Sequence, residues 1–285
     1  MSGPGLSEKV AVLGLGIIGS RACSRLVDAG WRVACWNRTP KGVAGETATP
    51  EEAVDGAAMI SIYLKDAPAL REIAGRIAAV LTPGQIVLNH STVDLETTRW
   101  LERICLSRAC RFLDAPFTGS KLASGSGQLV YYIGGDPALA DELEAYLSVT
   151  SKSRLYCGLH GAATVIKLAT NLISACTVQA MAEALAIATR HGVPAECLIS
   201  AVAQNVSGSM LTAMKFPTMA DGNFETHFSL SNMGKDSRYM LALAEAAGLE
   251  TPAIEAVSRR MAELCAAGLG EMDYSVVAKP YLEPS

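Results

Sequence analysis

The amino-acid sequence predicts an α/β domain with a doubly wound, Rossmann-like sheet, followed by an all-α domain, with one long interdomain helix joining the two. Short apolar runs alternate with amphipathic stretches over residues 9–157, which is typical of strand–helix–strand units. After Gly161 this alternation ends, and residues 162–191 contain neither glycine nor proline. We therefore expect the Rossmann-like domain to span residues 9–160 and the all-helical domain to span residues 161–285.

The individual elements follow from the spacing of the apolar residues. A short run rich in β-branched or aromatic residues predicts a strand, and apolar residues three and four apart predict a helix. We expect strands over 9–13, 31–36, 58–63, 85–90, 111–115, 128–133 and 153–157. Between them we expect helices over 17–29, 66–81, 94–108 and 137–147. The alternation indicates parallel βαβ units. The interdomain helix, of about 30 residues, would be ~45 Å long. Further helices are expected over 194–204, 208–220, 229–247 and 251–268.

Composition excludes several classes of protein. Half of the 285 residues are hydrophobic and 18% are charged, which provides for a substantial core. The 24 basic and 28 acidic side chains give a net charge of −4 and form no basic block, so we expect no nucleic-acid partner. Eight scattered cysteines without a CxxC spacing indicate reduced thiols rather than a metal site. Gln179 and Glu183 interrupt the most apolar segment, and no secretory signal is visible, so we expect a cytoplasmic protein without a membrane span.

The most informative stretch is residues 9–39, which reads as strand, glycine turn, helix and strand. Gly14 permits a tight turn, Gly16 lets the backbone approach a pyrophosphate, and Gly19 lets the helix pack closely on the strand. The N–H groups and the positive dipole end of the helix would face the phosphates. The sequence therefore predicts a dinucleotide site formed by Gly14, Leu15, Gly16, Ile17, Ile18 and Gly19.

The residues after the second predicted strand select the cofactor. An Asp or Glu there would bind the ribose 2′-hydroxyl of NAD, but the sequence has Asn37, Arg38 and Thr39. A guanidinium between two small polar side chains suits a 2′-phosphate, which favours NADP(H). The alternative interpretation is an ordinary solvated loop after a strand.

Two further segments are candidates for a substrate site. Thr118, Gly119 and Ser120 form a turn just after a predicted strand, at the sheet edge where such folds bind ligands. Their backbone N–H groups and hydroxyls could converge on a carboxylate, although many such turns are only turns. Lys167 lies in an apolar helical segment, and Asn171 follows on the same helix face. A lysine and an amide there suit carbonyl reduction, while a lysine paired with a carboxylate at a domain boundary is the alternative.

These motifs together resemble a known family. The sequence carries, in order, GLGIIG, WNRT, NHSTV at 89–93, DAPFTGS at 114–120, then Gly161 with Lys167 and Asn171, and finally Phe228-Ser229-Leu230 followed by Lys235-Asp236. Over residues 9–280 the chain resembles a β-hydroxyacid dehydrogenase of the 6-phosphogluconate-dehydrogenase-like superfamily. TGSK followed by GQLV is most similar to the glyoxylate/succinic semialdehyde reductase branch, whereas 3-hydroxyisobutyrate dehydrogenases usually show SGG in that turn.

The resemblance implies a role for each matching residue. Lys167 would be the catalytic acid/base, and Thr118–Ser120 would hold the substrate carboxylate with the help of Asn171. Leu64 and Thr92 would line the binding site of the dinucleotide along its length from adenine to nicotinamide, and Lys235 would reach the cofactor from the helical domain. The implied activity is NADPH-dependent reduction of a small aldehyde acid of the glyoxylate, succinic semialdehyde or tartronate semialdehyde type. The implied assembly is a homodimer or homotetramer formed through the helical domains.

Some residues depart from the family pattern and put the substrate in question. Ala163 stands where a second glycine is common, Phe117-Thr118 replaces Val-Ser, and residues 122–126 replace a more acidic loop. An imine reductase and a 3-hydroxyisobutyrate-type dehydrogenase are the enzymatic alternatives, and imine reductases generally lack the lysine. A non-catalytic dinucleotide-binding scaffold is the third. The four histidines have no ligand spacing, and Asp236 suits either a functional charge or a local ion pair.

Overall fold

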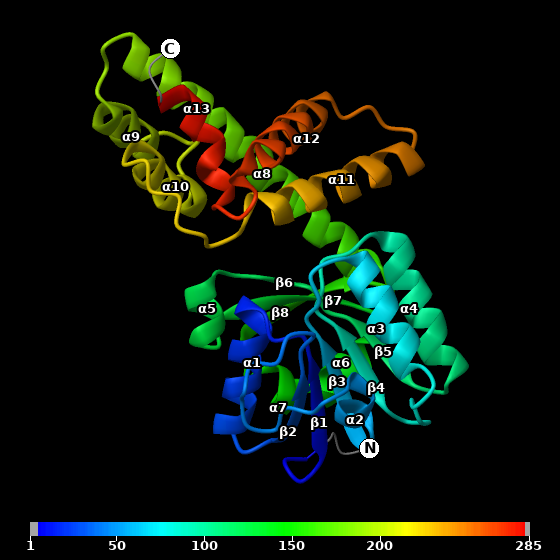
Figure 1. The fold of residues 1–285 in the computed structure, drawn as a ribbon. Coiled ribbons are helices and arrows are strands. Elements are labelled where there is room, and N and C mark those ends of the chain that lie inside the picture. Colours follow the sequence, from blue (N-terminus) through cyan, green and yellow to red (C-terminus); the bar gives the residue numbers. More distant parts are fainter. Residues whose placement is uncertain (1–4, 283–285) are drawn as a thin grey trace. The chain divides into compact units, whose positions relative to one another are not determined.

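The computed structural model describes residues 5–282, and the chain divides into two compact units, Met1–Lys167 and Leu168–Ser285 (Figure 1). The first is a Rossmann-like sheet-and-helix domain and the second is helical, as the sequence predicts. The division between the units falls within the long helix α8, whereas the sequence-based domain boundary lies at its start, between residues 160 and 161.

The sheet of the first unit has the strand order β2-β1-β3-β4-β5-β7-β6, and β8 also pairs with β7. The strands are β1 (Lys9–Leu13), β2 (Arg32–Trp36), β3 (Ala57–Ile62), β4 (Ile86–Asn89), β5 (Arg111–Asp114), β6 (Phe117–Thr118), β7 (Leu129–Gly134) and β8 (Ser151–Gly158). β1 to β5 are parallel neighbours, which is the doubly wound half of the sheet.

One part of the sheet differs from the expected all-parallel arrangement. β7 is antiparallel to both β5 and β6, and it pairs in parallel only with β8. The connection from β5 to β7 contains the two-residue strand β6, which pairs with β7, and the five-residue helix α5, instead of a long crossover helix across one face of the sheet. The chain therefore reverses direction at this point and forms a hairpin-like return.

Helices cover both faces of this sheet. They are α1 (Ile17–Asp28), α2 (Pro50–Val54), α3 (Ala67–Ile77), α4 (Leu95–Ser107), α5 (Lys121–Gly125), α6 (Pro137–Glu142) and α7 (Glu144–Leu147). The side chains of Asp66 and Asp94 accept hydrogen bonds from backbone N–H groups in the first turns of α3 and α4, which fixes where these helices begin. α1 lies on one side of the sheet and α3 and α4 lie on the other (Figure 1). The reason is the strand order: β2 lies on one side of β1, whereas β3, β4 and β5 follow one another on its other side, so right-handed connections place their helices on opposite faces.

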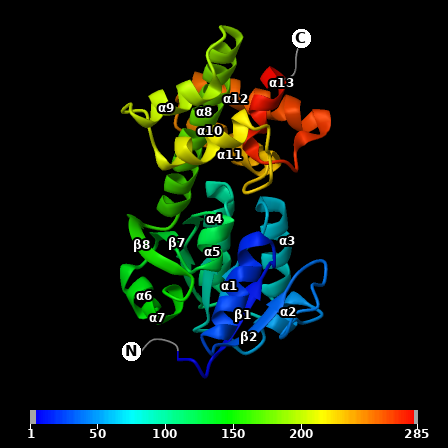
Figure 2. The same ribbon diagram turned by 90° about the vertical axis from the view of Figure 1, so that its left-hand side faces the viewer.

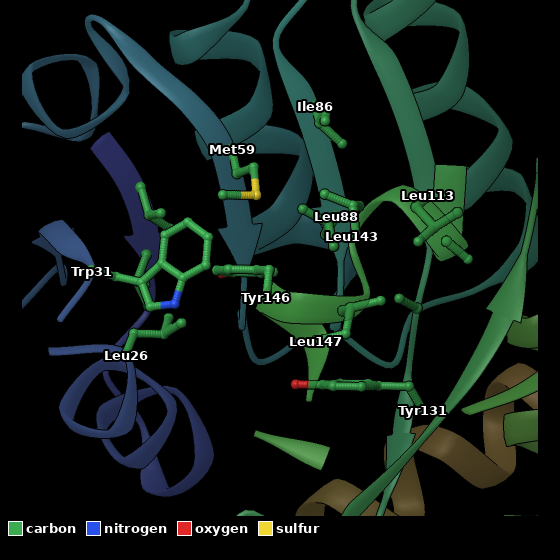
Figure 3. Close-up of a cluster of buried hydrophobic side chains, with 14 of the residues drawn as sticks. Leu26, Trp31, Met59, Ile86, Leu88, Leu113, Tyr131, Leu143, Tyr146 and Leu147 are labelled. Carbon is green, nitrogen blue, oxygen red and sulfur yellow. The ribbon is translucent and has the colours of Figure 1, made fainter. Parts of the chain in front are cut away.

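One hydrophobic core cluster of the first unit lies between the sheet and the α1 face (Figure 3). Leu26 of α1 and Met59 of β3 are buried there, and the ring of Trp31 meets the ring of Tyr146 edge-on at 5.4 Å. Aromatic pairs in this T-shaped geometry add about 0.5–1.5 kcal/mol to the stabilisation from burial. Trp31 is thus a core residue.

The second unit is built around α8 (Ala162–Arg190), whose first residues belong to the first unit. The remaining elements are α9 (Ala195–Ala203), α10 (Met210–Ala220), α11 (Leu230–Ala246), α12 (Pro252–Leu264), a π-helical turn (Cys265–Leu269), a 3₁₀ helix (Tyr274–Ala278) and α13 (Lys279–Leu282). α9 packs with α10, and α11 packs with α12 (Figure 2). No strand occurs in this unit among the residues up to 282.

α8 is long and apolar enough, by length and composition, to cross a membrane. The core helix of a globular domain meets the same criterion. Leu168, Ala175 and Val178 of α8 are fully buried in the hydrophobic cluster of the second unit. This burial favours the interpretation of α8 as a core helix.

Candidate active site

The ends of the five parallel strands form one row across the sheet. Trp36 pairs with Leu13, Leu13 with Ile62, Ile62 with Asn89, and Asn89 with Asp114. The residues just beyond this row include every cofactor and substrate position that the motifs predicted before α8: Gly14–Gly19, Asn37–Thr39, Leu64, Thr92 and Thr118–Ser120. The register of the sheet therefore brings five separate motifs to the carboxyl edge, where ligands of this fold bind.

The glycine turn has the geometry that its sequence predicts. Gly14 has φ +98°, and a Cβ there would overlap the carbonyl oxygen of Tyr63. A Cβ on Gly19 would overlap the carbonyl oxygen of Gly14, so α1 packs directly on the turn. Gly16 differs, since it has φ −68° and an added Cβ would meet nothing within 4 Å. No internal contact requires glycine at position 16, which fits a turn whose open side takes the phosphates of a dinucleotide.

The cofactor-selecting residues after β2, Asn37, Arg38 and Thr39 (the selector loop), are linked to this turn. The side-chain oxygen of Asn37 accepts a hydrogen bond from the backbone N–H of Leu15 at 2.9 Å, and its amide donates to the carbonyl of Thr39 at 2.7 Å. Asn37 therefore shapes the loop that presents Arg38. The guanidinium of Arg38 is exposed and pairs with Glu72 of α3 at 2.5 Å. A 2′-phosphate bound by Arg38 would compete with this carboxylate.

Leu64 and Thr92 follow the ends of β3 and β4. The backbone N–H of Leu64 donates to the hydroxyl of Ser91 at 2.8 Å, and the N–H of Ser91 donates to the side-chain oxygen of Asn89. These bonds hold the two loops together at the sheet edge. Ser91 is a functional candidate that the sequence analysis did not single out, although it lies within the NHSTV motif.

The turn that carries Thr118, Gly119 and Ser120 is tightly constrained. Thr118 lies in β6 opposite Val130. Gly119 has φ +140°, and a Cβ there would lie 2.7 Å from the side chain of Leu129, so no other residue fits without a shift. The hydroxyl oxygen of Ser120 accepts a hydrogen bond from the N–H of Ala123. This leaves the hydroxyl hydrogen of Ser120 able to donate to a carboxylate.

Asp114 joins the strand that precedes this turn to the start of α8. Its buried carboxylate accepts hydrogen bonds from the N–H of Thr164 at 2.9 Å and from the hydroxyl of Thr164 at 3.0 Å. Burial raises the pKa of Asp114 to about 6, and the bonds from Thr164 and Gly161 partly oppose that rise. Lys167, which is half-buried, follows Thr164 by three residues. Because Thr164 is bonded to Asp114 at the end of β5, this strand anchors the helical turn that carries Lys167.

Asn171 and Lys235 meet at a shared carboxylate in the second unit. The amide of Asn171 donates to one oxygen of Asp236 at 2.7 Å, and the ammonium of Lys235 lies 2.8 Å from the other. Asp236 is fully buried, and these two partners replace contacts that water would otherwise make with its carboxylate oxygens. The adjacent Lys235 and Asp236 in the sequence indicated a local ion pair. The bond from Asn171 to Asp236 joins residues 65 positions apart, so no local sequence pattern could predict it.

Two histidines have structural partners that the sequence did not indicate. The ring of His160 contacts Glu102 at 2.6 Å and the carbonyl of Phe112 at 3.0 Å, so both its nitrogens are used within the first unit. His90 is buried, and its Nδ1 lies 2.8 Å from the carbonyl oxygen of Ala115. Burial lowers the pKa of His90 to about 4, with the bond to Ala115 opposing the shift.

Asp114 and His90 are expected to give opposite contributions to the pH dependence of stability. The raised pKa of Asp114, from 3.8 to about 6, stabilises the fold below pH 3.8, and this contribution is lost as the pH rises through 6. The lowered pKa of His90, from 6.5 to about 4, stabilises the fold above pH 6.5, and this contribution is lost as the pH falls through 4. Each is worth about 3 kcal/mol, so the two nearly cancel between these limits.

Asp114→Asn removes one side of this balance. The free energy of unfolding of this variant, relative to that of the wild type, should fall by up to about 3 kcal/mol as the pH is lowered from 7 to 4. Urea unfolding at a series of pH values measures this difference. His90→Asn is the matched control and should change in the opposite direction. A difference that stays constant with pH would show that Asp114 has an ordinary pKa in the folded protein.

The Rossmann-like sheet, its glycine turn and the helical second unit define a dinucleotide-binding oxidoreductase. The family model described as the NAD binding domain of 6-phosphogluconate dehydrogenase matches residues 9–161. The model described as NAD-binding of NADP-dependent 3-hydroxyisobutyrate dehydrogenase matches residues 161–281. The chain belongs to this 6-phosphogluconate dehydrogenase-like, 3-hydroxyisobutyrate dehydrogenase family. Membership supports a β-hydroxyacid dehydrogenase type of oxidoreductase that uses a nicotinamide dinucleotide.

Curated relatives with two kinds of name are similar to this chain. Glyoxylate/succinic semialdehyde reductase 2, chloroplastic, of Arabidopsis thaliana is 28% identical over 278 residues, which cover 94% of this chain and 78% of the relative. Cytokine-like nuclear factor N-PAC of Homo sapiens is 28% identical over 285 residues, which cover 96% of this chain and 52% of the relative. The chain thus spans about half the length of N-PAC.

Solved structures share the fold at lower identity. Mycobacterium tuberculosis 3-hydroxyisobutyrate dehydrogenase with L-serine superposes with a TM-score of 0.89 at 23% identity, over 97% of this chain and 99% of that chain. An imine reductase of Streptomyces aurantiacus has a TM-score of 0.65 at 23% identity, over 97% of this chain and 100% of that chain. These likenesses confirm the predicted fold class.

Proposed function

We propose that the protein reduces a small aldehyde acid of the glyoxylate, succinic semialdehyde or tartronate semialdehyde type, with NADPH as the hydride donor. The observation that carries this proposal is the double attachment of β5. Its last residue, Asp114, leads into the turn at Thr118–Ser120 and also holds the first turn of the helix that carries Lys167. A carboxylate-binding turn and a proton donor are thereby supported by one strand. The name of the similar Arabidopsis thaliana protein, glyoxylate/succinic semialdehyde reductase 2, supports the same substrate class.

The residues would divide the chemistry as follows. The bound dinucleotide supplies the hydride. The N–H groups and hydroxyls of Thr118–Ser120 hold the substrate carboxylate, and Asn171 orients the substrate. The ammonium of Lys167 hydrogen-bonds to the carbonyl oxygen and gives that oxygen a proton as its negative charge develops. Asp236 fixes the amide of Asn171 and the ammonium of Lys235, so we assign it a positioning role in the second unit.

A substrate panel tests the proposal. Oxidation of NADPH, followed by the loss of its absorbance, is expected with at least one of glyoxylate, succinic semialdehyde and tartronate semialdehyde. 3-Hydroxyisobutyrate with NADP⁺ and a cyclic imine with NADPH represent the two enzymatic alternatives, both of which occur on this fold. Turnover of the imine alone would favour that alternative. NADPH binding without any turnover would favour a non-catalytic scaffold, for which the relationship to a nuclear factor is the specific support.

The preference for NADPH depends on Arg38. Arg38→Asp should raise the ratio of kcat/KM with NADH to that with NADPH by about 10- to 100-fold, because a charge-assisted bond to the 2′-phosphate is replaced by repulsion. The matched variant Glu72→Gln removes the carboxylate that pairs with Arg38 and should lower KM for NADPH severalfold. Steady-state kinetics with both cofactors measures these ratios. An unchanged ratio in Arg38→Asp would contradict the role of Arg38 in binding the 2′-phosphate.

We also propose that the protein is cytoplasmic and assembles as a homodimer or homotetramer. We propose that its partner is a small carboxylate substrate and that it binds neither nucleic acid nor a membrane. Ile173, Ala180 and Ile187 support the assembly, since they lie exposed at seven-residue intervals along α8 and form an apolar stripe suited to helix packing. Light scattering after size-exclusion chromatography measures the assembly, and a monomer at micromolar concentration would contradict it. Cell fractionation tests the location.

A further inference from the structure

We propose that His90 is a positioning residue that holds the substrate-binding turn at Thr118–Ser120 through the hydrogen bond from its Nδ1 to the backbone carbonyl of Ala115. This inference rests on the proposed function of that turn as the carboxylate site. It concerns a side chain with no ligand spacing in the sequence, which the structure places at the junction of the dinucleotide and substrate segments.

His90 extends the contact between two strands beyond their ends. The last pair between β4 and β5 is Asn89 with Asp114, and the N–H of Ala115 donates to the carbonyl of Asn89 at 2.9 Å. Nδ1 of His90 then donates to the carbonyl of Ala115 at 2.8 Å. The imidazole therefore supplies a link between the two chains at a position where the regular ladder has stopped. That link falls directly before the substrate-binding turn.

The bond from His90 to Ala115 ends a chain of hydrogen bonds that starts at Tyr146, and the direction of every bond in this chain follows from its two ends. A carbonyl oxygen only accepts, so Nδ1 of His90 must carry the hydrogen. The ring is neutral at physiological pH, because burial lowers its pKa to about 4, and Nε2 is then an acceptor. The hydroxyl of Ser61, 3.2 Å away, donates to Nε2, and the hydroxyl of Tyr146 donates to Ser61 at 2.7 Å. Tyr146, Ser61, His90 and Ala115 thus form a fixed relay in which each hydroxyl and ring position has one role.

The segment held by this relay has its other support on β7. The N–H of Tyr132 donates to the carbonyl of Pro116 at 2.8 Å, and Phe117 and Thr118 pair with residues of β7. Pro116 has no N–H, so it cannot donate a bond back toward β4. The attachment on the β4 side therefore depends on the two backbone groups of Ala115, of which His90 binds the carbonyl.

The ring of His90 also contacts the support of the dinucleotide turn. It stacks on Tyr63 at 4.5 Å with an interplanar angle of 18°, and it lies 4.8 Å from the ring of Tyr131. The hydroxyls of Tyr63 and Tyr131 are hydrogen-bonded at 2.9 Å. Tyr63 lies against Gly14, and Tyr131 lies opposite Phe117, so His90 stands between the two ligand segments. Figure 3 shows Tyr131 and Tyr146 among the packed side chains of this core.

Two amide variants, which both lack the imidazole ring, separate the bond to Ala115 from the other contacts of His90. The amide nitrogen of asparagine occupies about the position of Nδ1, whereas that of glutamine occupies about the position of Nε2. His90→Gln should raise KM for the aldehyde acid about tenfold with a smaller change in kcat, as expected for the loss of one hydrogen bond to the turn. His90→Asn should stay within about twofold of the wild type. Affinity for NADPH should stay within about twofold in both variants.

Hydrogen exchange tests the inference without any turnover. In the protein without substrate, His90→Gln should speed amide exchange in the peptide covering residues 116–124, and His90→Asn should not. The peptide covering residues 10–20 serves as an internal control for general destabilisation. Tyr146→Phe is the control variant, because Ser61 still donates to His90 after its loss, so exchange in residues 116–124 should be unchanged.

Several results would overturn the inference while leaving the proposed function intact. Equal effects of His90→Gln and His90→Asn, or faster exchange in residues 10–20 as well, would show a general packing role. Nitrogen-15 NMR of the wild type, which has four histidines, should show one buried Nδ1–H tautomer, and an Nε2–H tautomer at His90 would contradict the relay. If the wild type reduces no aldehyde acid, the proposed function fails, but the exchange data still decide the role of His90.

Discussion

Replacing Lys167 with alanine is expected to lower kcat/KM for the aldehyde acid by about two to four orders of magnitude, the usual contribution of a positioned general acid. The substrate carbonyl would lose both a hydrogen-bond donor and the source of its proton. Affinity for NADPH should remain within about twofold, because the glycine turn and the selector loop lie at the ends of β1 and β2. Stopped-flow measurement of NADPH oxidation gives the rate, and fluorescence titration gives the affinity.

Control variants separate chemistry from structure in this test. Lys167→Met keeps the length and apolar stem of the side chain, so it should lose as much activity as Lys167→Ala while packing more like the wild type. Val165→Ala changes a partly exposed residue of the same helical turn and should keep full activity. Retained turnover in Lys167→Met would exclude Lys167 as the proton donor. Loss of NADPH affinity together with rate would instead indicate that Lys167 supports the cofactor site.

The strands and long helices could be predicted from sequence because their signals are local. Each of the expected strands, from 9–13 to 153–157, occurs within about two residues of its predicted bounds, since apolar runs end at glycine or polar residues. α2, α5 and the two-residue β6 were not predicted. Elements of two to five residues are too short for their apolar residues to show the repeat of a helix or a strand. The reversal of β7 was also missed, since strand direction depends on the length of the connection and on packing.

The candidate site shows the same distinction. Gly14–Gly19 and Thr118–Ser120 are contiguous motifs, so their geometry could be inferred residue by residue. The bonds from Asn171 to Asp236 and from His90 to Ala115 join residues 65 and 25 positions apart. Such bonds depend on how strands and helices pack, and polar residues that make them look like any buried polar residue in the sequence. Motifs therefore identify the groups that contact ligands, whereas the structure is needed to find the groups that position them.

Alanine substitutions in the glycine turn are expected to have the second large effect, on thermal stability and on affinity for NADPH. Gly19 and Gly16 are glycines for different reasons, so their variants should differ. Gly19→Ala places a methyl group onto the carbonyl of Gly14 and 3.0 Å from Cβ of Tyr63, so α1 must move away from the sheet. Overpacking of this kind typically costs 1–3 kcal/mol, and a lowered midpoint of thermal unfolding is expected. Affinity for NADPH should fall as well, because the helix that faces the phosphates is displaced.

Gly16→Ala should separate these two effects. Its backbone has φ −68° and ψ −166°, which alanine adopts readily, and its Cβ would point into open space. The midpoint of thermal unfolding should therefore change little, while the dissociation constant for NADPH should rise at least tenfold, since the methyl group would occupy the path of the pyrophosphate. Gly75→Ala, at a position in α3 with open space, is the matched glycine control and should leave cofactor affinity unchanged. If Gly16→Ala binds NADPH as tightly as the wild type, the pyrophosphate does not approach position 16, and the dinucleotide must lie differently from what the turn predicts.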